Sequence, residues 1–142
     1  MARVLIVGCG CRGQELARDL VVAGHAVRGT TRDPARTAAI AATGAEPYVG
    51  DPDRIGTLME ALRGVTILCW LHGTVPDPEL HGGRLRMLFE KLVDTPVRGV
   101  VYEAALAEGE LIARDAADRW QIPVAIVEPG EARGAVDRLL GL

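Results

Sequence analysis

The chain has 142 residues, 49% of them hydrophobic and 25% charged, with a formal net charge of −3. This size and balance predict one globular domain over residues 1–142, and an acidic chain without a basic stripe argues against a nucleic-acid partner. The apolar runs are too short to cross a bilayer and no signal peptide is visible, so we expect a cytoplasmic protein without membrane contact.

Strand-like apolar segments alternate with helical patterns along the chain, which is typical of an α/β domain with a parallel sheet. The predicted strands are 3–7, 25–31, 46–49, 65–71, 97–102 and 124–127. The predicted helices are 11–23, 33–43, 53–63, 79–93, 106–120 and 131–140. Right-handed crossovers between these strands predict a doubly wound Rossmann-type sheet of order 3-2-1-4-5-6, with helices on both faces.

The first predicted strand leads into a glycine-rich turn, Gly8-Cys9-Gly10-Cys11-Arg12-Gly13, and a helix follows at once. A GxGxxG pattern in this context is the dinucleotide-binding fingerprint. Gly8 permits the tight turn, Gly10 lets the backbone approach a pyrophosphate, and Gly13 lets the helix pack close to the strand. The helix N-terminus offers free N–H groups to phosphate, so we expect these six residues to bind a cofactor.

The end of the second predicted strand bears on which dinucleotide is bound. NAD sites usually carry an acidic residue there, whereas NADP sites favour arginine. This chain has Thr31-Arg32 at that position, and Asp33 followed by Pro34 is better explained as a helix cap. Arg32, with Arg12 from the glycine turn, could hold a 2′-phosphate. The sequence therefore favours NADP over NAD.

Two further positions at the predicted carboxyl edge suit a dinucleotide. Asp51, after the third strand, could accept a hydrogen bond from the adenine amino group. Leu71-His72-Gly73, after the fourth strand, would line the route to the nicotinamide ribose, where His72 could donate a hydrogen bond or shuttle a proton. We expect His25 to be structural and His81 to lie on a helix surface.

The three cysteines, Cys9, Cys11 and Cys69, form neither a Cys-x-x-Cys motif nor a zinc set, so no metal site is predicted. Cys69 lies in an apolar run and is expected in the core. Cys9 and Cys11 flank Gly10, where small turn residues are the simpler interpretation and a redox-sensing Cys11 is the alternative.

Several segments together resemble the extended and atypical short-chain dehydrogenase/reductases, including epimerase-like and NmrA-like members. They are the glycine turn, Gly-His-Ala-Val-Arg-Gly-Thr-Thr-Arg-Asp-Pro at 24–34, Gly-Asp at 50–51, Ala-Leu-Arg-Gly-Val at 61–65, and residues 108–129. The resemblance covers most of the chain. It implies NAD(P) binding at Gly8, Gly10, Gly13 and Arg32, with adenine contact at Asp51.

The catalytic residues of that family are absent from this sequence. The family uses Ser or Thr after strand five and a Tyr-x-x-x-Lys motif, but the chain has no serine and Leu106 lies four residues after Tyr102. The 142 residues also end one helix after the sixth predicted strand, without the family's substrate-binding region. Tyr102, Glu103 and His72 remain candidates for unorthodox proton transfer at the carboxyl edge.

Three functions stay open at this point. The first is an NADP-binding protein that senses the cofactor or regulates a partner. The second is a small oxidoreductase or epimerase-like enzyme with a non-standard proton donor, and the third is an interaction module without cofactor. The family also implies a homodimer through the helices that follow strands four and five.

Overall fold

The computed structural model describes residues 2–141 and contains one six-stranded parallel sheet of order β3-β2-β1-β4-β5-β6. The strands are β1 (Arg3–Val7), β2 (Ala26–Thr31), β3 (Glu46–Val49), β4 (Ile67–Trp70), β5 (Gly99–Glu103) and β6 (Val124–Val127). The predicted fold class and strand order are therefore confirmed. β1 and β4 are neighbours although β2 and β3 lie between them in sequence, so the strand order reverses there.

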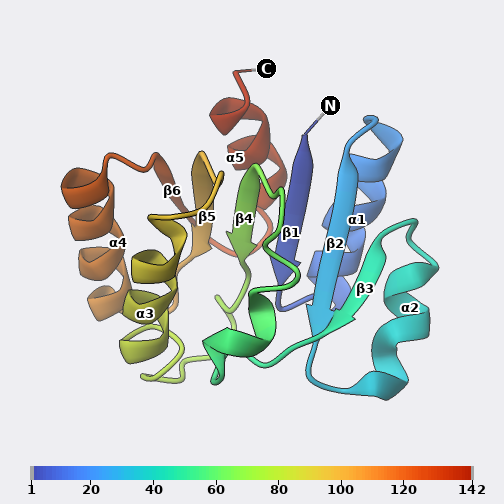
Figure 1. Cartoon of the computed structure of the whole chain (residues 1–142), viewed down its shortest axis with the longest axis horizontal. Coiled ribbons are helices and arrows are strands. Elements are labelled where there is room, and N and C mark those ends of the chain that lie inside the picture. Colours follow the sequence, from blue (N-terminus) through green and yellow to red (C-terminus); the bar gives the residue numbers. More distant parts are fainter. Residues whose placement is uncertain (1, 142) are drawn as a thin grey trace.

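Helices cover both faces of this sheet (Figure 1). They are α1 (Cys11–Val22), α2 (Thr37–Ala41), α3 (Gly83–Leu92), α4 (Ala107–Trp120) and α5 (Ala132–Leu139), with short 3-10 turns η1 (Pro34–Arg36) and η2 (Ile55–Leu58). The core under η2, α3 and α4 contains Leu5, Trp70 and Phe89, whereas the core under α1, α2 and α5 contains Ile6, Leu20 and Val136. Alternate residues of β1 thus serve opposite cores, as a doubly wound sheet requires.

The central strands are buried on both faces, which explains why the sequence shows continuous apolar runs there. All four residues of β4 and all five of β5 are buried. All six strands point their carboxyl ends toward the lower edge in Figure 1, where α1 also begins. In such sheets ligands bind at this edge, beside the reversal of strand order.

The predicted helix at 53–63 is wrong: the segment forms η2 followed by turns. Its apolar residues Ile55, Leu58 and Leu62 are nevertheless buried, so the periodicity reflects packing. The Thr57 hydroxyl donates to the Arg54 carbonyl at 2.7 Å and accepts from the Asp51 N–H at 2.8 Å. A threonine that bonds local backbone in this way competes with a regular helix, and Gly56 weakens the helix further.

The helix expected from residue 79 begins instead at Gly83, and His81 is not on its surface. His81 has no exposed surface, because its side chain is drawn into the core toward β5. The Trp70 indole N–H donates to the Leu80 carbonyl at 3.1 Å. These two long-range contacts hold residues 80–81 in a non-helical backbone until α3 can begin.

Two local predictions are confirmed. Asp33 caps the segment that leads into α2, its carboxylate accepting from the Ala35 N–H at 2.9 Å. His25 is structural, since its Nδ1 accepts from the Ala2 N–H at 3.2 Å. Within residues 2–141, no helix is long and apolar enough to cross a membrane.

Candidate functional site

A cleft of about 370 Å³ opens at the carboxyl edge of the sheet, where β1 and β4 meet. Its walls come from the glycine turn, the ends of β2 and β3, and the loop after β4. The lining residues are Gly8, Cys9, Gly10, Cys11, Arg12, Gly13, Thr30, Thr31, Arg32, Arg36, Gly50, Pro52, Leu71, His72, Thr74, Val75 and Leu80. The topology therefore brings together most residues that the sequence selected for cofactor binding.

The three glycines of the turn have different surroundings. Gly8 has a φ of +90°, and a Cβ added there would lie 2.7 Å from the Leu71 carbonyl oxygen. A Cβ on Gly13 would lie 3.0 Å from the Gly8 carbonyl oxygen, whereas a Cβ on Gly10 would meet no atom within 4 Å. The backbone at Gly10 is thus open toward the cleft, while Gly8 and Gly13 are needed for the turn and for helix packing.

The cleft carries positive charge on its β2 side. Arg32 is 63% exposed and lies 3.7 Å from an Asp53 carboxylate oxygen, and Arg36 lies 3.9 Å from Asp33. Exposed ion pairs at such distances are weak, so both guanidinium groups can turn toward an anion in the cleft. With the N-terminus of α1 at its floor, this part of the cleft suits phosphate.

The structure places two predicted cofactor residues outside this lining. Asp51 accepts a hydrogen bond from the Asp53 N–H at 2.9 Å, and its neighbours Gly50 and Pro52 face the cleft instead. The Gly73 N–H donates to Glu103 Oε1 at 2.8 Å, and neither residue lines the cleft.

His72 lies in the wall of the cleft, edge-on to the Trp70 ring at a centroid distance of 4.9 Å. It is 8% exposed, and its buried Nε2 has no hydrogen-bond partner in the described structure. Burial, together with smaller effects of the neighbouring His81, Arg32 and Arg12, lowers the pKa of His72 to about 4. A neutral imidazole with a free nitrogen beside the glycine turn can exchange a hydrogen bond with a ligand.

Glu103, at the end of β5, is 1% exposed and forms an ion pair with Arg12. Nη1 of Arg12 also lies 3.4 Å from the Thr74 hydroxyl. The arginine of the glycine turn therefore extends toward β5, away from Arg32 and the end of β2. The Glu103 carboxylate is held by two donors, the Arg12 guanidinium and the Gly73 N–H.

Tyr102 points into the opposite core and has no exposed surface. Its hydroxyl lies 2.5 Å from His81 Nδ1, and burial, reinforced by Glu110, raises the pKa of Tyr102 to about 12. Tyr102 and Glu103 thus lie on opposite sides of β5, and Tyr102 does not line the cleft.

The cysteines divide by burial. Cys69 is fully buried, as expected, and burial raises its pKa. Cys9 is also buried, packed against Gly29, where an added Cβ would lie 2.8 Å from its sulfur; burial raises the pKa of Cys9 to about 11. Cys11 is exposed at the start of α1 and lines the cleft. The described residues contain no group of three side chains suited to a metal ion.

Sequence reasoning missed part of the site. Arg36 lies one helical turn after the Asp33 cap, a position that could have identified it as a neighbour of Arg32. Thr74, Val75 and Leu80 come from the loop after β4, and nothing in their local pattern distinguishes them. Their place depends on His81 and Trp70, which fold that loop over the cleft.

No protein-family model matches this sequence, and no curated protein matches it. Several solved structures, however, are similar to this chain. The chain is similar to Citrobacter sp. triphenylmethane reductase complexed with NADP(H), at 20% identity and a TM-score of 0.71, over 89% of this chain and 48% of that one. It is similar to a short-chain dehydrogenase/reductase superfamily protein from Agrobacterium tumefaciens with bound NAD, at 18% identity and a TM-score of 0.69, over 89% and 48%.

A putative NAD-dependent epimerase/dehydratase from Bacillus halodurans is also similar, at 15% identity and a TM-score of 0.72, over 90% of this chain and 70% of that one. The chain spans about half the length of the first two structures. At these identities the likeness establishes the fold alone, which is the Rossmann-type fold that the sequence predicted.

Proposed function

We propose that the chain binds a dinucleotide, NADP in preference to NAD, and acts as a cofactor sensor or regulatory protein without standard short-chain dehydrogenase catalysis. The observation that carries the proposal is the cleft itself. The open backbone at Gly10 and the N-terminus of α1 lie in one lining with the exposed Arg32 and Arg36. This arrangement fits a diphosphate and a ribose phosphate.

The fit extends to the surrounding groups. The free Nε2 of His72 is a buried polar atom without a partner, as expected where a ligand completes the hydrogen bonding. Two of the similar structures carry NADP(H) and NAD, which supports a dinucleotide without deciding between them. The cofactor would supply hydride chemistry, whereas this chain supplies binding and orientation.

The residues at the carboxyl edge support a non-catalytic role. β5 ends without serine or threonine, and no Tyr-x-x-x-Lys motif occurs. Of the candidate proton donors, Tyr102 is buried against His81, and Glu103 is paired with Arg12. A general acid or base must reach the reacting atoms, and of the three candidates only His72 lines the cleft, with a lowered pKa that leaves its imidazole neutral.

Calorimetric titration of the chain with NADPH and NADH tests cofactor binding. We expect NADPH to bind more tightly, and Arg32→Ala to weaken NADPH about tenfold or more while changing NADH little, because Arg32 would meet only the 2′-phosphate. Arg63→Ala is the matched control, since Arg63 is exposed and far from the cleft, paired with Glu60. If neither cofactor binds at millimolar concentration, the proposal fails.

Turnover tests the regulatory half of the proposal. The chain with NADPH is assayed against carbonyl, quinone and enone substrates, and we expect no oxidation of NADPH above the background rate. Sustained turnover that Arg32→Ala reduces would instead establish a small oxidoreductase with a non-standard proton donor.

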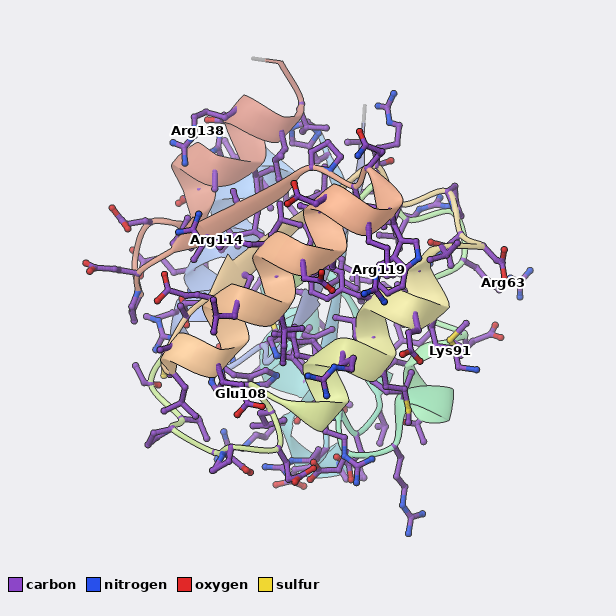
Figure 2. The ribbon with its side chains drawn as sticks, turned by 90° about the vertical axis from the view of Figure 1, so that its left-hand side faces the viewer. Arg63, Lys91, Glu108, Arg114, Arg119 and Arg138 are labelled. Carbon is purple, nitrogen blue, oxygen red and sulfur yellow. The ribbon has the colours of Figure 1, made fainter. Side chains whose placement is uncertain are left out.

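We also propose that the chain forms a homodimer through α3 and α4, which pack together on one face (Figure 2). A groove there is lined by the apolar side chains of Phe89, Leu111, Ile112 and Trp120, of which Leu111 is 68% exposed. Charges of both signs flank it: Arg86, Glu90, Glu108, Asp115 and Arg119. A face carrying both signs is complementary to itself, which a two-fold interface requires.

A further inference from the structure

The cleft covers the first half of a dinucleotide site and, in the second half, only the loop after β4. A doubly wound sheet consists of two mononucleotide-binding halves, the first built on β1–β3 and the second on β4–β6. Every lining residue of the cleft comes from the first half or from the loop after β4. A separate hollow lies over the carboxyl ends of β5 and β6, lined by Ala104, Ala105, Leu106, Ala107, Glu110, Ile126, Val127, Glu128 and Glu131.

The ion pair of Arg12 and Glu103 lies beside the cleft, and both residues also line a third, smaller hollow between α1 and α5. Arg12 lines the cleft, and Glu103 immediately precedes the wall of the second hollow at Ala104. The pair joins three elements of the edge, because Glu103 also accepts the N–H of Gly73 after β4. The ion pair therefore joins the glycine turn to the ends of β4 and β5, where the two halves of the site meet.

The local backbone is shaped to hold Glu103 in this position. A Cβ added to Gly73 would lie 2.5 Å from Glu103 Cγ, so only glycine leaves room for the side chain to cross residue 73. The carboxylate is almost fully buried, and separating it from Arg12 would leave an uncompensated buried charge. The closed arrangement is thus supported by sterics, hydrogen bonding and charge together.

We propose that the Arg12–Glu103 pair closes the site to the nicotinamide ring, so that the chain recognises the adenosine half of the cofactor. This inference rests on the proposed function and narrows its ligand class. The ligand is an adenosine nucleotide with a 5′-diphosphate and a ribose phosphate, held by the glycine turn, Arg32 and Arg36. The nicotinamide group adds nothing to its binding.

The test compares NADPH with 2′-phospho-ADP-ribose, which is NADP without its nicotinamide ring, by calorimetry on the wild-type chain. We expect dissociation constants within about threefold of each other. NADPH binding tighter by about tenfold or more would overturn the inference while leaving NADP binding intact. Failure of both ligands to bind would overturn the proposed function as well.

Two variants that break the Arg12–Glu103 ion pair provide a second test. In Glu103→Ala the carboxylate is removed, and in Gly73→Ala the added Cβ displaces Glu103 without changing any charge. Both should leave 2′-phospho-ADP-ribose binding within about threefold of wild type and tighten NADPH relative to it by about fivefold or more. Asp94→Ala, which removes an exposed carboxylate after α3 and outside every hollow described here, should keep the wild-type ratio. An unchanged ratio in both Glu103→Ala and Gly73→Ala, with circular dichroism showing that both are folded, would contradict closure of the site by the Arg12–Glu103 pair.

Discussion

The Tyr102 hydroxyl lies 2.5 Å from Nδ1 of His81, and this contact connects the core of the sheet to the wall of the cleft. Nε2 of His81 lies 2.9 Å from the carbonyl oxygens of both His72 and Val75. Since carbonyls only accept, Nε2 carries the proton and Nδ1 accepts from Tyr102. One buried imidazole therefore ties the loop after β4 to β5.

Replacing Tyr102 with phenylalanine tests this connection. The change leaves His81 Nδ1 buried without a donor, so we expect the free energy of unfolding to fall by about 1–3 kcal/mol in urea denaturation. Tyr48→Phe is the matched control, because the Tyr48 hydroxyl contacts Glu46 at the exposed surface, and it should cost less than about 0.5 kcal/mol. Equal losses in the two variants would show that the buried contact contributes nothing specific.

Gly109, in α4, provides the space for the Tyr102 hydroxyl. A Cβ added there would overlap that hydroxyl and lie 3.2 Å from the His81 carbonyl oxygen. Gly109→Ala should therefore lower the free energy of unfolding by about 1–3 kcal/mol, despite the better helix propensity of alanine. In Gly134→Ala, on α5, the nearest atom would be Arg138 Nη1 at 3.5 Å, so this control should stabilise the chain by up to about 1 kcal/mol. A neutral Gly109→Ala would contradict the packing described here.

The fold and the glycine turn could be predicted because their signals are local. A continuous apolar run such as Val65–Leu71 predicts a strand covered on both faces, and the strand–glycine–helix order fixes where the cleft opens. Arg32 was predictable for the same reason, since the end of β2 faces the cleft in every sheet of this order.

The rest depends on contacts between residues far apart in sequence. His81 stands in a stretch of turn and helix formers, and only its contact with Tyr102, 21 residues away, draws it into the core. Arg12 lies 91 residues from Glu103, so its direction along the edge could not be read from the glycine turn. At 53–63 the apolar spacing correctly predicted burial, but the hydrogen bonds of Thr57 prevent a regular helix.

The low pKa of His72 predicts a pH dependence of stability. The unfolded chain takes up a proton near the ordinary pKa of 6.5, whereas the native side chain does so only near 4. The contribution of neutral His72 to the free energy of unfolding is therefore fully present above about pH 6.5. It is lost at about 1.4 kcal/mol per pH unit as the pH drops toward 4. Between pH 7 and pH 5, His72→Gln should lose about 2 kcal/mol less than wild type in urea unfolding. Parallel losses in the two proteins would exclude His72 as the source.

The groove between α3 and α4 predicts that self-association depends on Leu111. This side chain is exposed in the isolated chain and lies at the apolar part of the groove, so a second copy would bury it. Placing a charge there leaves that charge without solvent or partner in the dimer, and Leu111→Asp should weaken the dimer at least about tenfold in sedimentation equilibrium. Val22→Asp is the matched control, because Val22 is exposed at the end of α1, outside the groove. A wild-type chain that sediments as a monomer at micromolar concentration, or equal weakening in both variants, would contradict an interface on this face.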